Sequence, residues 1–209
     1  MLDLELYKKI SAARKKMNSK VSEFLSSAAV LRAGRYLRLI DKNGSFISDD
    51  EEDIKRVIYF SNCELKTDGK SAADLALEAD IGENEFEKEY LKGLVRAFSS
   101  LFEVVDVNRK GACITCRDLL NSEKREYEVT DIGFSKTAKI SNLIFNIIIP
   151  VYGGFISNGI VFSFQSEYKN AIMKEYNSIE NRGVSSHSPK RFRLFLYLNR
   201  KMGTPVIYE

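Results

Sequence analysis

Two cysteines three positions apart form the one motif in this sequence that is typical of a named chemistry. Cys113 and Cys116 have the C-x-x-C spacing of thiol redox centres and of zinc sites. A redox pair needs its first thiolate at a helix N-terminus, but these cysteines lie in an apolar, strand-like run. Residues three apart on a strand point to opposite faces, so the spacing does not favour a redox pair.

A zinc site is the other chemistry that this pair could serve. Zinc needs four ligands, and Cys63 and His187 would complete a Cys3His set with Cys113 and Cys116. The motif has no glycine turn and no second C-x-x-C pair, which favours two small residues packed in a sheet. We therefore predict no metal site, although the sequence leaves open whether the four residues converge.

No pair of nucleophile and base is evident, so we predict no catalytic residue. His187 is the only histidine, and it lies among serines in a polar segment without a third group to orient it. Glu126 and Glu128 share a strand face, which gives the alternative of a hydrolytic enzyme that uses strand carboxylates. Alternating polar residues that face water explain this pair as well. The other carboxylates near the strands are Asp106, Asp118 and Asp131, and Arg117-Asp118 is typical of a turn.

Basic residues at both ends of the chain give a nucleic-acid hypothesis. The net charge is only +3, but residues 1–40 carry +6, residues 41–100 carry −7 and residues 165–209 carry +4. If both ends fold together, their cations form one positive face for single strands or RNA. The alternatives are a buried final helix with a basic rim, and lysines that pair with acids of residues 49–53 and 83–89. The candidate residues are Lys8, Lys15, Lys16, Lys190, Arg191 and Arg193.

The elements that would position these residues begin with helices. Apolar residues recur at helical spacing from Leu6 to Leu31, which predicts one long amphipathic helix that Asn18-Ser19 could break and Gly34 ends. A hairpin is predicted around the turn at residues 41–44, followed by a helix that begins in the acidic run 48–53. Further helices are expected from Ser71 to Asp80 and over residues 83–100.

The second half of the chain has the pattern of a small sheet. Turn residues separate five runs rich in β-branched and aromatic residues, which suggest a curled antiparallel sheet or barrel. Helix returns at Ser166, and residues 181–188 are predicted to form a loop. Residues 190–201 alternate like a strand, but Pro189 and Gly203 at the two ends favour a helix. The predicted strands are residues 102–107, 112–117, 127–131, 142–149 and 155–164.

The stretch from Phe102 to Phe164 resembles a β module that recurs in uncharacterised bacterial proteins, some of which carry a C-terminal zinc-binding SEC-C motif. The segments that carry the resemblance are Phe102-Glu-Val-Val105, Cys116-Arg-Asp-Leu-Leu120, Tyr127-Glu-Val-Thr-Asp131, Ser135-Lys-Thr137, Ile149-Pro-Val151 and Gly159. Asn121-Ser122 replaces the glycine expected after Leu120, and the C-terminal cysteine cluster is absent. The resemblance implies a small β module and brings no activity, metal or partner with it.

These observations predict an α+β protein with a helical N-terminal part, a small antiparallel sheet or barrel, and C-terminal helices. The expected division is a helix-rich region at 1–100 and a β module with C-terminal helices at 101–209. The longest apolar run, residues 143–151, is too short to span a membrane, and no signal peptide is evident, so we expect a cytoplasmic protein. A non-enzymatic binding or regulatory role with a protein partner is the function expected, and no cofactor is predicted because no phosphate-binding glycine loop is present.

Overall fold

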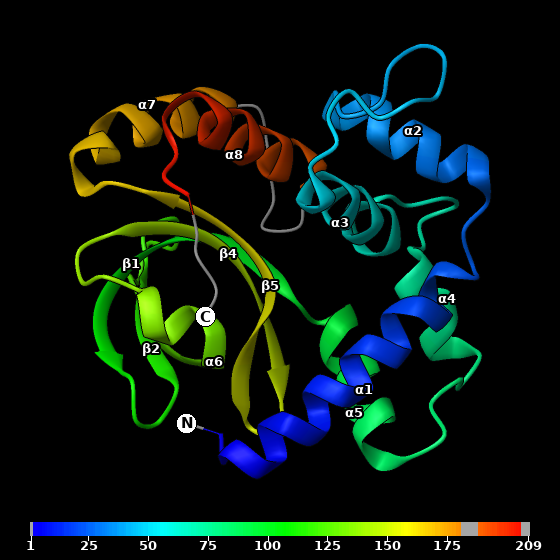
Figure 1. The fold of residues 1–209 in the computed structure, drawn as a ribbon, viewed down its shortest axis with the longest axis horizontal. Helices are drawn as coiled ribbons and strands as arrows, with labels where there is room; N and C mark the ends of the chain where they lie inside the picture. Colours follow the sequence, from blue (N-terminus) through cyan, green and yellow to red (C-terminus); the bar gives the residue numbers. More distant parts are fainter. Residues whose placement is uncertain (1, 181–187, 206–209) are drawn as a thin grey trace. The chain divides into compact units, whose positions relative to one another are not determined.

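A computed structural model describes residues 2–180 and 188–205 (Figure 1). Within these residues the chain is α+β, with helices first, then a five-stranded sheet and then C-terminal helices, which confirms the predicted fold class. The chain forms two compact units. One unit holds residues 8–96, and the other holds residues 1–7 together with 97–209.

The N-terminal helical stretch is two helices, as the alternative of a broken helix allows, but the break lies at residues 23–26 and not at Asn18-Ser19. The helix α1 (Leu4–Ser22) runs through Asn18-Ser19 without a break, and Ser26 starts α2 (Ser27–Leu37) by accepting a hydrogen bond from the backbone N–H of Ala29. Gly34 lies inside α2 and does not end it. The helix ends instead at Arg38, which adopts the left-handed conformation with φ of 60°.

The hairpin predicted around residues 41–44 is reduced to a single antiparallel bridge, although the turn itself forms. Asp41 accepts hydrogen bonds from the backbone N–H groups of Asn43 and Ser45, which closes the turn. Only one isolated bridge, between Ile40 and Phe46, flanks it. Tyr36 and Leu37 of the segment before the turn belong to α2, which leaves only the residues after Arg38 to pair across the turn.

The acidic run and Ser71 start helices as predicted. Asp50 caps α3, and Ser71 forms a reciprocal capping box with Asp74. The helix predicted over residues 83–100 is shorter, because the strand β1 already begins at Phe98. The helices that follow α2 in this unit are α3 (Glu51–Tyr59), the π-helical turn η1 (Phe60–Glu64), α4 (Ala72–Glu78) and α5 (Glu85–Val95).

Five strands form a closed barrel in the order β1-β2-β3-β5-β4. Four of the five pairings are antiparallel, as predicted, but β3 and β5 pair in parallel through Val129 opposite Phe155 and Thr130 opposite Ile156. The sheet is therefore mixed. The strands are β1 (Phe98–Asn108), β2 (Cys113–Asp118), β3 (Glu126–Thr130), β4 (Leu143–Val151) and β5 (Gly154–Phe164).

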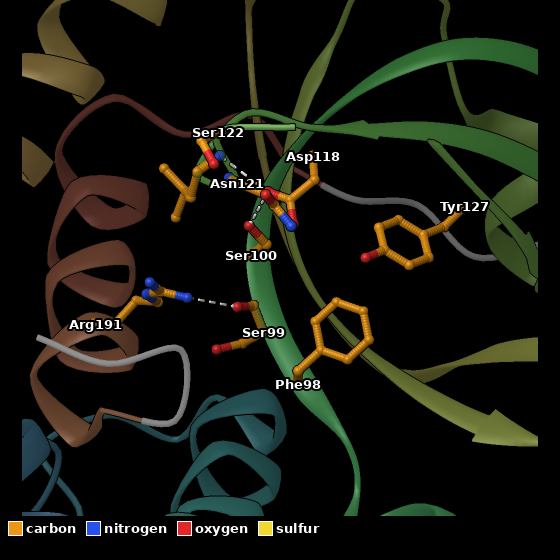
Figure 2. A pocket seen from close by; sticks show the side chains of 9 residues that line it. Phe98, Ser99, Ser100, Asp118, Asn121, Ser122, Tyr127 and Arg191 are labelled. Atoms are coloured by element: carbon orange, nitrogen blue, oxygen red, sulfur yellow. Dashed lines mark hydrogen bonds between the residues drawn. The ribbon is translucent and has the colours of Figure 1, made fainter. Parts of the chain in front are cut away.

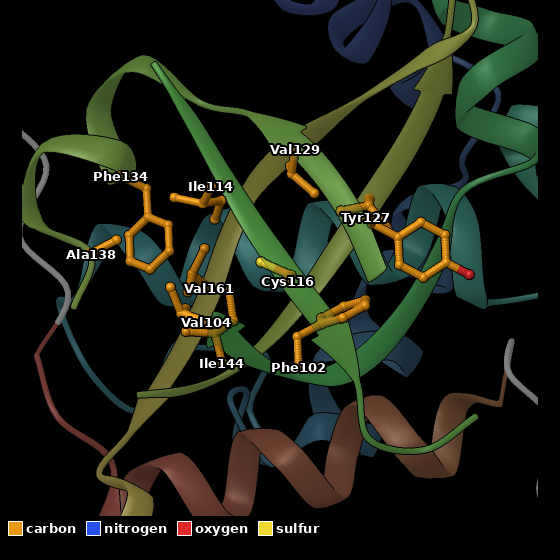
Figure 3. Close-up of a cluster of buried hydrophobic side chains, with 11 residues drawn as sticks. Phe102, Val104, Ile114, Cys116, Tyr127, Val129, Phe134, Ala138, Ile144 and Val161 are labelled. Atoms are coloured by element: carbon orange, nitrogen blue, oxygen red, sulfur yellow. The ribbon is translucent and has the colours of Figure 1, made fainter. Parts of the chain in front are cut away.

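The barrel has a distinct end at each side of its apolar core (Figure 3). The helix α6 (Ile132–Thr137) lies at one end, and the sequence pattern did not predict it. Asp131 caps this helix by accepting a hydrogen bond from the Phe134 N–H. Phe134 and Ala138 from this segment join the core cluster of the barrel. Tyr127 and Phe102 belong to the same cluster and lie toward the opposite end.

C-terminal helices cover the outside of β4 and β5 (Figure 1). Residues 190–201 are helical, as predicted, and Phe192, Phe195 and Leu196 lie at helical spacing on the buried face. Phe192 stacks edge-on against Phe162, with ring centroids 5.6 Å apart, and Phe195 lies parallel to Phe145 at 4.4 Å. The helices are a single 3-10 turn, η2 (Ser166–Tyr168), then α7 (Lys169–Glu180) and α8 (Pro189–Met202).

Candidate ligand-binding site

A pocket of about 440 Å³ lies at the Tyr127 end of the barrel (Figure 2). The start of β1, the end of β2, the start of β3 and one turn of α8 supply its walls. This volume lies in the range of sites that hold small molecules. The lining residues are Phe98, Ser99, Ser100, Asp118, Leu120, Asn121, Ser122, Tyr127 and Arg191.

Asp118 is the buried carboxylate of this pocket, and its two oxygens differ. Oδ1 accepts hydrogen bonds from the Ser100 hydroxyl and from the backbone N–H groups of Leu120 (2.9 Å) and Asn121 (3.2 Å). Oδ2 has no donor among the described residues, and the side chain is 5% exposed. Asp118 lines the pocket, so Oδ2 is an acceptor that a ligand could use.

Tyr127 places a hydroxyl group at the opposite wall of the pocket. Its ring is held edge-on by Phe102 (6.1 Å) and Phe155 (5.2 Å) and tilted against Phe98 (5.3 Å). The residue is 8% exposed, and its hydroxyl has no hydrogen-bond partner among the described residues. The hydroxyl points toward Ser100 and Asp118 (Figure 2). Burial raises its pKa, with nearby Asp118 adding to the rise, so the group is a neutral phenol at physiological pH.

An amide and a guanidinium complete the polar walls. The Oδ1 atom of Asn121 accepts a hydrogen bond from the backbone N–H of Glu123, which leaves its Nδ2 as a donor with no acceptor among the described residues. Arg191 is buried and donates from Nη1 to the carbonyl oxygen of Ser99 (3.0 Å) and from Nη2 to the hydroxyl of Tyr176 (2.5 Å). Half-buried Phe98 gives the pocket an aromatic face.

One family has a sequence profile that matches residues 1–209. The chain belongs to this family of unknown function, DUF7986. No curated protein and no solved structure matches the chain. Among the described residues, no helix has the length and apolar character that crossing a membrane requires.

In this DUF7986 chain the two cysteines of the C-x-x-C motif lie on opposite faces of β2, as their spacing predicts. Cys116 belongs to the barrel core, whereas Cys113 lies outside that cluster, and neither forms a disulfide. Burial raises the pKa of both thiols. No cluster of three or more metal-ligand residues exists within the described part of the chain, and His187 lies outside it.

The strand carboxylates of the enzyme alternative are exposed. Glu126 pairs with Arg117 across the β2–β3 ladder at 2.8 Å, as expected for polar residues that face water. Glu128 and Asp106 lie at the register positions on either side of Thr115. A catalytic pairing of these acids with His187 cannot be described, because His187 is outside the described residues.

The basic residues of the nucleic-acid hypothesis have different surroundings. Lys8, Lys15 and Lys190 are exposed, while Lys16 pairs with Glu83 (2.6 Å) and Glu87 (2.9 Å), as the alternative for the helix lysines expects. Arg193 is half-buried, and Arg191 is buried inside the barrel unit rather than presented to solvent. A single positive face made by both ends of the chain stays a prediction.

Sequence reasoning recognised Asp118 as a strand acid and a turn residue but not as the centre of a pocket. The signal that could have found it is the segment Cys116-Arg-Asp-Leu-Leu120. This segment carries part of the resemblance to the β module described above, and it supplies two lining residues, Asp118 and Leu120. Ser100, Tyr127 and Arg191 have no local signal, since they join Asp118 only through strand pairing and helix packing.

Proposed function

We propose that this protein is a non-enzymatic binding protein for a small molecule that bears an N–H donor group, such as an amine or a primary amide. The observation that carries the proposal is the divided carboxylate of Asp118. One oxygen is fixed by three donors, and the other lines the pocket without a donor among the described residues. A ligand N–H would supply the missing charge-assisted hydrogen bond.

The other pocket groups suit the rest of such a ligand. The Tyr127 hydroxyl and the Asn121 amide can each donate to a ligand carbonyl, since neither donates to a described residue. Phe98 and the edge of the Tyr127 ring offer contact to a planar apolar group. A primary amide on an aromatic ring would meet the acceptor, the donors and the aromatic face together.

Binding without turnover is the reading that fits Ser100. Its hydroxyl donates to Asp118 Oδ1, the same oxygen that fixes the β2–β3 turn through two backbone N–H groups. A nucleophilic serine needs a base that is free to accept its proton during the reaction. This carboxylate oxygen is engaged in holding the turn, so Ser100 serves to orient Asp118.

Three probes with the same ring test the proposal: benzylamine, benzamide and benzoate. We expect the first two to raise the melting temperature and benzoate, which has no N–H, to leave it unchanged. At ten times its Kd a ligand stabilises the folded state by about 1.4 kcal/mol. For a chain of this length that energy shifts the melting temperature by about 3–6 °C.

Asp118→Asn is the decisive variant, because an amide can keep the acceptor at Oδ1 while the second atom becomes a donor. We expect it to remain folded by circular dichroism and to lose the response to benzylamine. Asp106→Asn removes an exposed carboxylate outside the pocket and is the matched control. An unchanged response in Asp118→Asn, an equal response to benzoate, or no response to either N–H probe in the native protein would each refute the proposal.

A further inference from the structure

A second pocket, of about 500 Å³, lies at the α6 end of the barrel and has a different chemistry. The turn after β1, the end of α6, the loop before β4 and the end of β5 supply its walls. Three of its lining residues are cations and none is an acid. The lining residues are Arg109, Phe134, Lys136, Thr137, Ala138, Lys139, Asn142, Ser163, Gln165, Thr204 and Pro205.

The cations of this pocket have no carboxylate partner among the described residues. The side chains of Lys136 and Lys139 make neither an ion pair nor a hydrogen bond to any described residue, and both are exposed. Other lysines of this protein do pair with acids, as Lys169 does with Glu103 at 3.2 Å. Like charges gathered around one pocket repel each other, and an anion between them relieves that repulsion.

Arg109 is held in place by backbone acceptors rather than by an acid. Its Nε donates to the carbonyl oxygen of Lys136 and its Nη2 donates to that of Ala138, each at 3.4 Å. These carbonyls lie at the C-terminal end of α6, where their partial negative charge would oppose an anion. The guanidinium covers them, and its remaining N–H groups have no acceptor among the described residues.

Neutral groups add donors and an apolar floor. The side-chain amide of Asn142 has no partner among the described residues, and the hydroxyl groups of Ser163 and Thr204 lie 3.0 Å apart at the same wall. Phe134 and Ala138 form the apolar part of the lining. Three cations with an amide donor match the charge and the several oxygens of a phosphate group better than those of a single carboxylate.

We infer that this second pocket is an anion site for a small soluble molecule that carries a phosphate monoester. The phosphate contacts Arg109, Lys136 and Lys139, and the organic part lies toward Phe134. The site is separate from the Asp118 pocket, since β1 begins at one pocket and ends at the other.

Calorimetric titration with phenyl phosphate at low salt tests this assignment. The double variant Lys136→Gln/Lys139→Gln is compared with Lys174→Gln/Lys201→Gln, which removes the same charge from exposed positions of α7 and α8. We expect the first variant to bind at least about tenfold more weakly than the native protein and the second to bind within about twofold of it. Both variants should have the same midpoint of urea unfolding as the native protein, because the four lysines are exposed.

Three results would overturn the inference. The first is an equal weakening of phenyl phosphate binding in both double variants. The second is a binding heat for sodium chloride equal to that for phenyl phosphate at the same ionic strength. The third is no binding of phenyl phosphate to the native protein. Vesicles of phosphatidylcholine with phosphatidic acid test the lipid source of the same chemistry, and binding to vesicles alone would overturn the assignment to a soluble ligand. Asp118→Asn should bind phenyl phosphate like the native protein, which separates this test from that of the proposed function.

Discussion

Arg191 of α8 reaches the backbone of β1, where its Nη1 donates to the carbonyl oxygen of Ser99, 92 positions earlier in the chain. Its Nη2 donates to the Tyr176 hydroxyl of α7, and its guanidinium lies 5.3 Å from the centre of that ring. One buried side chain thus connects both C-terminal helices to β1, whose first residues line the Asp118 pocket.

Arg191→Met should destabilise the protein by about 2–4 kcal/mol, because it leaves buried acceptors without their charged donor. Equilibrium unfolding in urea measures this change. Tyr176→Phe removes one of the hydrogen bonds and should cost about 1 kcal/mol. Lys201→Met removes a positive charge from the exposed face of the same helix and should change stability by less than about 0.5 kcal/mol. Equal effects of the two charge removals would show that the buried contacts contribute little.

Gly34→Ala should destabilise the protein although alanine favours helices. A Cβ at this position would overlap the side chain of Ile40, which is packed against α2 and only 5% exposed. We expect a net loss of about 1–3 kcal/mol, because overpacking outweighs a helix-propensity gain of about 1 kcal/mol.

A double-mutant cycle with Ile40→Ala identifies the cause of this loss. In the Ile40→Ala background the overlap is gone, so Gly34→Ala should become neutral or stabilising. Additive effects of the two substitutions would contradict close packing as the reason for this glycine.

The stability of the helical unit should depend on acid through Glu83. Hydrogen bonds from Lys16 and Lys20 lower the pKa of Glu83 from 4.5 to about 2. A carboxyl group with a lowered folded-state pKa stabilises the fold above its unfolded value, so this contribution is present above about pH 4.5 and is lost as the pH falls toward 2. Glu83→Gln should flatten the fall in stability across this window, as measured by urea unfolding at several pH values.

Exposed Glu85 offers the control for this experiment, since it makes no ion pair with a described residue. Glu85→Gln should leave the acid dependence as steep as in the native protein. High salt should reduce the difference between Glu83→Gln and the native chain, because the pairs are exposed and screened. A pH profile of Glu83→Gln that superimposes on the native one would contradict the role of these pairs.

The three cysteines should react slowly with Ellman's reagent in the folded protein. Burial raises the pKa of Cys63, Cys113 and Cys116, and the thiolate is the reactive form. We expect rates at least about tenfold lower than in concentrated urea. Asn177→Cys places a thiol on the exposed face of α7 and should react quickly in the folded state. Fast reaction of two native thiols, or loss of both on mild oxidation, would revive the redox interpretation.

The five strands could be predicted from the sequence because alternation and turn residues are local signals. The predicted strand at residues 155–164 differs from β5 by one residue, and that at 112–117 from β2 by one residue at each end. The helix α6 was missed because six residues are too few to show helical periodicity. It forms because Asp131 caps it and the barrel core buries Phe134. Gly34 was misjudged because its role is set by a contact with Ile40, not by its own conformational freedom.

The pocket at Asp118 depends on contacts that the sequence does not encode locally. Ser100 meets Asp118 only after β1 and β2 pair, and Tyr127 reaches the same end of the barrel because β3 pairs with β2. Arg191 has the composition of a basic surface segment, yet helix packing buries it. Residue type and spacing identified the carboxylate, and the tertiary structure alone separates its two oxygens.

The parallel pairing of β3 with β5 gives the barrel a seam. Only two residue pairs close it, whereas β4 and β5 pair along nearly their whole length. A ladder this short is expected to open before the longer ladders when the barrel undergoes local unfolding. Tyr127 lies two residues before Val129 on this edge, and its ring meets Phe155 across the seam at 5.2 Å. A molecule that fixes Tyr127 therefore fastens the seam as well, and occupancy of the pocket can be read as slower amide exchange at Val129 and Ile156.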